Sequence, residues 1–338
     1  MNNSPKEFNH DDLVHKDNNS IKRKCLVLGI SVGAALHKTS LSLFYSNLSA
    51  QFEAIHAFYE HFSPDFLFTP MDLSVEAECF GGEVSFSHTD APSIKNRFIN
   101  GVDQVEDLNI PHVGFKRDKL YLDVAGRIVS LKKPTPFFAG VTGPFTVAGR
   151  LFGITEIFNL TIEDESSAKE LIEKCSQYLL NYILEFKKIG CDGVLIAEPL
   201  AGLLSPGSMH NFSSTYIHSL VEKVQSDDFQ VIYHNCGAKK VHLDTIYETD
   251  AAVFHFGAPM DMIAALDKSG EGKIVSGNLD PNKVFLSTDH QFVIHSVQEL
   301  MDSMKPYPNF LIATGCDLSM RTPLQNISSF FSITRTGK

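Results

Sequence analysis

The sequence lacks the features that define several large protein classes. No apolar run approaches the roughly 18 residues needed to cross a bilayer, so nothing in the sequence indicates a membrane protein. The N-terminal stretch MNNSPKEFNHDDLVHKDNNSIKRK contains no apolar segment of the kind found in signal peptides. We therefore expect a cytoplasmic protein.

Basic residues are not in excess either. The formal net charge is −11. Because nucleic acid phosphates are bound by clustered Lys and Arg, this charge balance argues against nucleic acid as a partner. It leaves room for an anionic small molecule, which needs only a local basic patch.

A glycine-rich dinucleotide fingerprint and an internal linker are also missing. The stretch GISVGAALH matches the Gly-x-Gly-x-x-Gly spacing poorly, which argues against an open dinucleotide-binding sheet. No stretch rich in Pro, Gly and Ser divides the chain after residue 25. We expect one domain over residues 25–338, preceded by a flexible polar tail over residues 1–24.

What the sequence does contain is a regular alternation of apolar runs and amphipathic helices. The segment 167–190 has the pattern of a long helix that ends at a glycine. Such an alternation indicates parallel strands joined by helical crossovers. The predicted fold is α/β, a single (β/α)8 barrel of the TIM type with an N-terminal extension. The predicted strands include 65–70, 136–144, 193–198, 230–235, 251–256, 273–278 and 309–314.

The six cysteines divide into two groups. In a reducing compartment cysteines are buried packing residues, metal ligands or nucleophiles rather than disulfides. Four of them lie within predicted elements or beside apolar and glycine neighbours, and we interpret these as packing residues: Cys25, Cys79, Cys175 and Cys191. The other two, Cys236 and Cys316, follow predicted strands.

The ends of the predicted strands carry a possible metal site. In an α/β barrel the chemistry lies at the carboxyl ends of the strands. His234 and Cys236 are two residues apart at one such end, a spacing that points both side chains to one face. Cys316 follows a later strand on the same rim. Imidazole and two thiolates are preferred zinc ligands, and three of them leave a fourth position open for catalysis. A chance His-x-Cys pair with a buried cysteine is the alternative interpretation.

Six segments stand out by their order and spacing: MDLSVEAECFGGEV, VTGPFTVAGRLFG, GCDGVLIAEPLAGLLSP, HNCG, SGNLDP and TGCDLSMRTPLQNI. In these segments the chain resembles the uroporphyrinogen decarboxylase superfamily, and more closely its corrinoid-dependent methyltransferase branch, which includes the methylcobamide:coenzyme M methyltransferases. Two positions separate the branches: the decarboxylases lack His-x-Cys-Gly and have histidine in place of Cys316. The decarboxylases also have an arginine-rich N-terminal segment, whereas GISVGAALHKTS contains no arginine.

The resemblance implies that His234, Cys236 and Cys316 hold Zn²⁺. It further implies an enzyme that moves a methyl group from a methyl-Co(III) corrinoid to a zinc-activated thiol such as coenzyme M. Only the thiolate is a good nucleophile, and a coordinated thiol is deprotonated. The sequence shows no corrinoid-binding segment, so the expected partner is a small corrinoid protein.

Three carboxylates near strand ends are weaker candidates. Asp72 matches the essential aspartate of the decarboxylases by position, and it is predicted to orient substrate, to bond a zinc ligand or to cap the following helix. Glu76 and Glu198 are predicted to be a transient fourth ligand or hydrogen-bond partners of His234, with surface solvation as the alternative.

A further group is predicted to line the substrate pocket. Asn278 and Asp280 lie in the turn GNLDP, for which a purely structural role is the competing interpretation. His255 follows an apolar strand and is equally interpretable as a buried core histidine. Arg321 and Lys239 are candidates for holding an anionic tail on the thiol, against simple solvation.

Two alternative functions remain open. One is decarboxylation of a tetrapyrrole, which needs a basic clamp and no metal. The other is binding of a corrinoid protein or a thiol without turnover.

Overall fold

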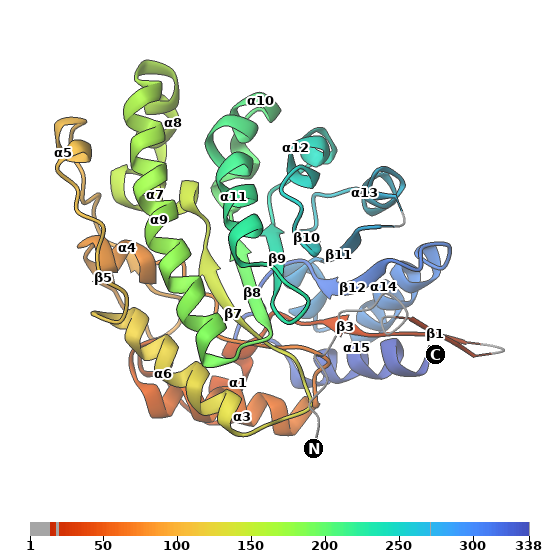
Figure 1. The fold of residues 1–338 in the computed structure, drawn as a ribbon. Coiled ribbons are helices and arrows are strands. Elements are labelled where there is room, and N and C mark those ends of the chain that lie inside the picture. The colour runs from red at the N-terminus through yellow and green to blue at the C-terminus, as the bar shows by residue number, and fades with distance from the viewer. Residues whose placement is uncertain (1–13, 18–19, 271, 338) are drawn as a thin grey trace.

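The core of the protein is a curled sheet of eight parallel strands (Figure 1). The computed structural model describes residues 14–17, 20–270 and 272–337. From the second strand of this sheet to the eighth, each strand pairs with the next one in the sequence, and the first strand pairs with the eighth. The strands are β3 (Cys25–Leu26), β4 (Leu67–Phe68), β7 (Phe137–Thr142), β8 (Gly193–Ala197), β9 (Gln230–Asn235), β10 (Val253–Phe256), β11 (Ile274–Leu279) and β12 (Phe310–Thr314).

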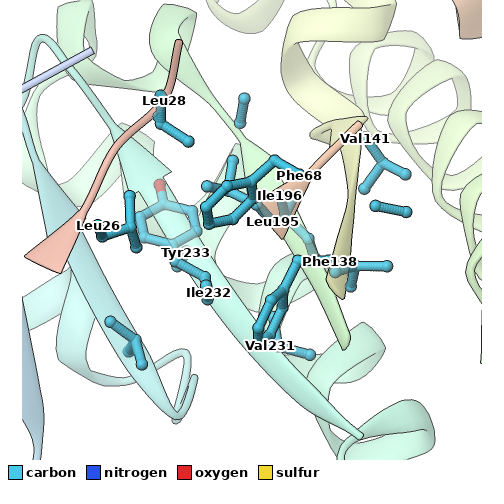
Figure 2. Close-up of a cluster of buried hydrophobic side chains, with 14 of the residues drawn as sticks. Leu26, Leu28, Phe68, Phe138, Val141, Leu195, Ile196, Val231, Ile232 and Tyr233 are labelled. Carbon is cyan, nitrogen blue, oxygen red and sulfur yellow. The ribbon is translucent and has the colours of Figure 1, made fainter. Parts of the chain in front are cut away.

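The curl brings the two edge strands together. Side chains from β3 and β4, Leu26 and Phe68, lie in one apolar cluster with Leu195 and Tyr233 from the middle strands (Figure 2). Within the described residues, the backbone ladder itself is not completed between β3 and β4. There the Asp65 carboxylate accepts a hydrogen bond of 2.9 Å from the backbone N–H of residue 25. The α/β fold with parallel strands is therefore confirmed, and its strand order is consistent with the expected TIM-type barrel; a side-chain hydrogen bond spans the one unpaired seam.

Helices cover the outer face of the sheet, as Figure 1 shows. Strands such as β8 and β12 are buried along their whole length, as expected when both faces of a parallel sheet are covered. The α-helices are α1 (Ile30–Leu36), α2 (Leu41–Ser46), α3 (Leu48–Phe62), α4 (Val75–Phe80), α5 (Asp103–Glu106), α6 (Arg117–Ser130), α7 (Pro144–Phe152), α8 (Ile154–Glu163), α9 (Glu165–Ile189), α10 (Pro206–Met209), α11 (Thr215–Val224), α12 (Leu243–Tyr247), α13 (Met262–Ser269), α14 (His290–Ser303) and α15 (Leu324–Thr336).

Shorter elements fill the loops. A two-stranded antiparallel ladder pairs β5 (Val84–Ser85) with β6 (Ser93–Ile94) in the long connection between β4 and β7. The remaining helical turns are η2 (Pro199–Leu203), η3 (His210–Ser214), η4 (Lys240–His242) and η5 (Pro281–Phe285). No helix in the described part of the chain combines the length and apolarity needed to cross a bilayer.

The long helix α9 confirms the pattern predicted for residues 167–190. The Asp164 side chain accepts from the backbone N–H of Ser167 and so caps the first turn. Gly190 ends the helix with φ +97°, a left-handed conformation that glycine adopts without steric cost. The buried face of the helix packs on α6, α7 and α11.

The segment expected to be a flexible tail is partly ordered. Within residues 1–24, β1 (Val14–Asp17) and β2 (Ser20–Arg23) form an antiparallel ladder, while residues 1–13 lie outside the described residues. Arg23 is buried, and its guanidinium donates to the carbonyls of Phe310 and Met304. The polar composition did not reveal this attachment, because the acceptors lie more than 280 residues away.

Candidate metal centre

Three predicted ligands meet at the carboxyl end of the sheet. His234 lies in β9, Cys236 follows that strand directly, and Cys316 lies two residues after β12. One donor atom from each lies within 4.8 Å of the other two. Zinc bonds to nitrogen and sulfur are about 2.0–2.3 Å long, so one ion reaches all three donors after a small contraction. The donor set and its spacing thus fit Zn²⁺.

A histidine pair fixes which nitrogen of His234 faces the thiols. His255 lies beside His234 in register on β10, and the two Nδ1 atoms are 2.6 Å apart. Burial, and then the neighbouring His234, lower the pKa of His255 well below its usual value, so its ring is neutral. Its Nε2 lies 2.9 Å from the Thr314 carbonyl, which can only accept, so Nε2 carries the hydrogen. His255 Nδ1 must then accept from His234 Nδ1–H, and the lone pair of His234 Nε2 is left for a metal.

The same hydrogen-bond chain links the two ligand-bearing strands. It runs from His234 in β9 through His255 to the last residue of β12, Thr314, two residues before Cys316. The Thr314 hydroxyl also accepts from the backbone N–H of Leu28, beyond β3. The imidazole and the more distant thiol are therefore positioned by one connected network.

The two thiols interact directly with each other. A hydrogen bond from the Cys316 thiol lowers the pKa of Cys236 to about 7, against the opposing effect of burial. The same hydrogen bond, together with burial, raises the pKa of Cys316 to about 12. The interaction therefore makes Cys236 the more acidic thiol of the pair.

All three donors open onto a cavity of about 250 Å³. The cavity gives a ligand access to the open side of the donor set, which is the arrangement of a catalytic rather than a closed structural site. Its wall is mostly apolar. The lining residues are Leu28, Met71, Leu73, Ala91, Pro92, Arg150, Ala197, Pro199, His234, Cys236, Cys316 and Asp317.

A glycine allows the loop after β9 to lie close to β10. A Cβ atom at Gly257 would lie 2.2 Å from the Cys236 carbonyl oxygen, closer than any side chain tolerates. Asn278 reinforces the same region, since its Nδ2 donates to the carbonyls of Gly257 and Met260. Asn278 therefore supports a loop beside the site, and it does not line the cavity.

Asp72 is held in a buried ion pair rather than facing a substrate. Its carboxylate accepts from the Arg117 guanidinium, the Tyr121 hydroxyl, and the backbone N–H and hydroxyl of Ser74. Arg117 comes from α6 and is itself almost completely buried. This geometry does not support the predicted role in orienting substrate. Asp72 accepts from the N–H of Ser74, which precedes α4, and it does not cap the first turn of that helix.

Glu198 caps a helix instead of contacting His234 through its side chain. Its carboxylate accepts from the backbone N–H groups of Phe145 and Thr146 and from the Thr146 hydroxyl, at the start of α7. A Cβ at Gly143 would lie 2.4 Å from Glu198 Oε2, so only glycine permits this approach. Burial raises the pKa of Glu198 to about 7, and the hydrogen bonds to Thr146 oppose that rise.

The third carboxylate, Glu76, is also buried away from the cavity. Its Oε1 accepts a hydrogen bond of 2.8 Å from the backbone N–H of Thr142, and burial raises its pKa to about 7. Like Glu198, it is absent from the cavity wall. Neither carboxylate reaches the position of a fourth ligand.

The remaining pocket predictions are not supported. Asp280 caps η5 by accepting from the backbone N–H groups of Asn282 and Lys283. Arg321 and Lys239 have exposed side chains and do not line the cavity. His255 is fully buried behind His234 and acts on that ligand rather than on the pocket.

Two charged residues of the cavity were missed at the level of sequence. Arg150, in α7, and Asp317, next to Cys316, both line it. Burial raises the pKa of the Asp317 carboxyl to about 8, with the neighbouring Cys316 contributing. The sequence did offer one clue to Arg150: it is the only charged residue in the otherwise uncharged stretch PFTVAGRLF, which forms a helix.

Comparisons with known proteins place this geometry in a family. The family described as Uroporphyrinogen decarboxylase (URO-D) matches residues 31–337. The uroporphyrinogen decarboxylase of Legionella pneumophila (strain Corby) is 24% identical over 267 residues, which are 76% of this chain and 74% of that protein. The chloroplastic enzyme of Zea mays is 24% identical over 236 residues, 67% of this chain and 57% of that protein.

Solved structures share the fold. A methyltransferase from Methanosarcina mazei superposes with a TM-score of 0.81 at 18% identity, covering 94% of both chains. A B12-independent methionine synthase from Shewanella sp. W3-18-1 gives a TM-score of 0.54 at 13% identity, covering 86% of this chain and 89% of the other. The family match extends over nearly the whole described barrel, and the chain therefore belongs to the uroporphyrinogen decarboxylase family.

Proposed function

We propose that this protein is a zinc-dependent methyltransferase that moves a methyl group from a methylated corrinoid to a thiol such as coenzyme M. The observation that carries the proposal is the group of His234, Cys236 and Cys316 at the carboxyl end of the sheet, beside a small cavity. The fold shared with a protein named as a methyltransferase is consistent with it.

His234, Cys236 and Cys316 would hold the ion. When bound, zinc would act as a Lewis acid that keeps the acceptor thiol deprotonated at neutral pH. The residues of the chain perform the rest. His255 fixes the tautomer of His234, and the two thiolates place negative charge beside the acceptor sulfur, which sustains its nucleophilicity.

The overall reaction forms a carbon–sulfur bond and breaks a carbon–cobalt bond. The acceptor thiolate attacks the methyl group of a methyl-Co(III) corrinoid, and both electrons of the broken bond stay on cobalt as Co(I). The cavity has room for a small thiol but not for a corrin ring. The corrinoid is therefore proposed to arrive at the cavity mouth on a separate small protein, and the barrel aligns the two reactants.

Metal analysis and methyl transfer test the proposal together. We expect about one zinc per chain in the purified protein, loss of that zinc in Cys316→Ala, and retention in the matched control Cys191→Ala, whose cysteine is buried outside the site. Demethylation of methylcobalamin, followed by its visible spectrum, should require both zinc and an added thiol. Full zinc retention in Cys316→Ala would sink the three-ligand assignment. An intact zinc site without transfer to any thiol would favour a binding protein without turnover.

Tetrapyrrole decarboxylation is the second candidate, because the curated relatives with 24% identity are named uroporphyrinogen decarboxylases. Two observations weigh against it. The cavity of about 250 Å³ is below the roughly 300–1,000 Å³ of typical ligand sites and cannot enclose a macrocycle. The Asp72 carboxylate is occupied by Arg117 and Tyr121. Turnover of uroporphyrinogen by metal-free protein would establish this alternative.

A further inference from the structure

Arg150 is a charged residue in a helix that is otherwise buried. Every other residue of α7, from Pro144 to Phe152, is buried, whereas Arg150 is half-buried and lines the cavity of the three metal ligands. Helical side chains lean back toward the N-terminus of their helix. The N-terminus of α7 follows the carboxyl end of β7, so this lean carries the guanidinium toward the rim where the ligands lie.

The guanidinium of Arg150 makes no hydrogen bond or ion pair with any residue that the structure describes. Its Nε is buried without a partner, and burial lowers its pKa, with a longer-range attraction from Asp72 opposing the change. Burying a polar group without a partner is unfavourable. The structure thus holds a half-buried guanidinium, with one N–H lacking a protein partner, at the wall of the proposed acceptor site.

A second arginine shows what a purely structural guanidinium looks like in this protein. Arg117 is also buried, but its nitrogens donate to Asp72, Glu78 and Ser74. The buried guanidinium of Arg117 thus has all its partners within the chain. The contrast indicates that the partner of Arg150 comes from outside the chain.

We propose that Arg150 selects the methyl acceptor by binding an acidic group carried on the same small molecule as the thiol. This inference rests on the proposed function, because it assumes that the thiol sulfur reaches the metal ligands. A carboxylate or sulfonate accepts two parallel N–H bonds from a guanidinium, which gives both affinity and orientation. The acid end at Arg150 and the sulfur at the ligands would fix the acceptor across the cavity.

The size of the cavity limits the spacer between the two groups. A volume of about 250 Å³ corresponds to a sphere roughly 8 Å across, which suits a compact ligand rather than a drug-sized one. A spacer of two or three carbons between sulfur and acid fits this span. Long-chain mercapto acids are expected to be poor acceptors.

A series of two-carbon thiols tests the assignment. The acceptors are 2-mercaptoethanesulfonate, 3-mercaptopropionate, neutral 2-mercaptoethanol and cationic cysteamine, with zwitterionic homocysteine as an additional arm. The wild-type kcat/KM for the two acids should exceed that for 2-mercaptoethanol about 10- to 100-fold, the range expected for a charged hydrogen bond. In Arg150→Gln the ratio should fall to about one, and Arg150→Lys should restore part of it.

The control variant is Arg97→Gln. Arg97 pairs with Glu156 outside the cavity, so this variant should keep the wild-type preference for acids. A wild-type protein that uses charged and neutral thiols equally well would overturn the inference and leave the proposed function standing. An acid preference that survives unchanged in Arg150→Gln would also overturn it.

Equilibrium binding gives a readout that does not depend on turnover. Ethanesulfonate carries the acid but no thiol, and calorimetry should detect its binding to the zinc-loaded wild type and to Arg97→Gln, with a loss of about tenfold or more in Arg150→Gln. If no thiol accepts a methyl group, the proposed function fails, yet this binding difference still supports the role of Arg150. Equal binding by Arg150→Gln and the wild type, or no binding by either, would overturn it.

Discussion

The Nδ1 atoms of His234 and His255 lie 2.6 Å apart, and the two residues are cross-strand neighbours in register on β9 and β10. Because the Thr314 carbonyl fixes the hydrogen on His255 Nε2, the pair has one consistent arrangement of hydrogens. A residue that the sequence offered only as a pocket or core histidine therefore controls the orientation of a proposed ligand.

Replacing His255 with Phe should weaken zinc binding without abolishing it. The change keeps an aromatic ring in a fully buried position but leaves His234 Nδ1–H without an acceptor. Loss of such an outer partner typically costs about 10- to 100-fold in metal affinity. Competition with a chelator of known affinity measures the change. His290→Phe, which alters a histidine bonded to Asn326 and Ser329 away from the site, should bind zinc like the wild type. Equal affinities in both variants would contradict the assigned role of His255.

Alkylation of the chelator-treated protein should single out Cys236. Its lowered pKa of about 7 means that the thiolate fraction, and hence the rate with iodoacetamide, should rise from pH 5.5 and level off above about pH 8. Restoring zinc should protect the residue. Peptide mapping identifies the modified position.

The other cysteines supply internal controls for that experiment. Cys316 should react more slowly at pH 7, since its pKa is raised to about 12. The remaining four thiols are buried and their pKa values are raised by burial, so they should stay unmodified in folded protein: Cys25, Cys79, Cys175 and Cys191. Preferential labelling of any of these four, or a rate independent of pH, would refute the assignment of Cys236 as the more acidic thiol.

Arg117→Leu should destabilise the fold by about 3–5 kcal/mol, because it leaves the buried Asp72 carboxylate without its cation. Urea unfolding followed by circular dichroism measures the difference. Lys119→Leu, two residues further along α6, removes an exposed pair with Asp123 and should cost no more than about 1 kcal/mol. Similar stabilities for the two variants would show that Asp72 does not depend on Arg117.

The rim of the barrel offers a surface for the proposed corrinoid partner. Leu203 in η2 and Val241 in η4 are 69% and 63% exposed, and the two loops are joined by the contact of His242 Nε2 with the Leu204 carbonyl. Leu203→Asp and Val241→Asp should raise the KM for a methylated corrinoid protein about tenfold or more, in keeping with the loss of apolar anchors. Rates with free methylcobalamin should not change.

Leu184→Asp is the matched control for the rim. Leu184 is exposed near the end of α9 that leads into β8, at the opposite end of the barrel. This variant should behave like the wild type with both methyl donors. A rim variant that slows both donors equally would argue for a disturbed site rather than a docking surface.

Much of the fold could be predicted from the sequence, because parallel strands that are covered on both faces appear as short continuous apolar runs. The predicted strand 230–235 coincides with β9, and 309–314 matches β12 within one residue. Because the active sites of such barrels lie at the carboxyl ends of the strands, the sequence also predicted that His234, Cys236 and Cys316 lie close together, and in the structure they do.

The other parts of the site depend on relationships that periodicity does not contain. The pairing of His255 with His234 requires the register between β9 and β10. The burial of Asp72 depends on Arg117, 45 residues away, and the placement of Arg150 depends on the direction in which α7 leaves its strand. The rim carboxylates were misassigned because a helix cap and a ligand have the same residue types at the same strand ends.

The two thiols are 80 residues apart, and Cys316 follows the last strand of the sheet. During synthesis the complete donor set therefore exists only after all eight strands have been made. A nascent or truncated chain offers only the His234–Cys236 pair, which binds an ion far more weakly than three ligands. Since an ion held only by the folded form stabilises that form, metal retention would report on whether a molecule has finished assembling its barrel. If the site binds zinc as proposed, we expect metal loading to follow completion of the barrel.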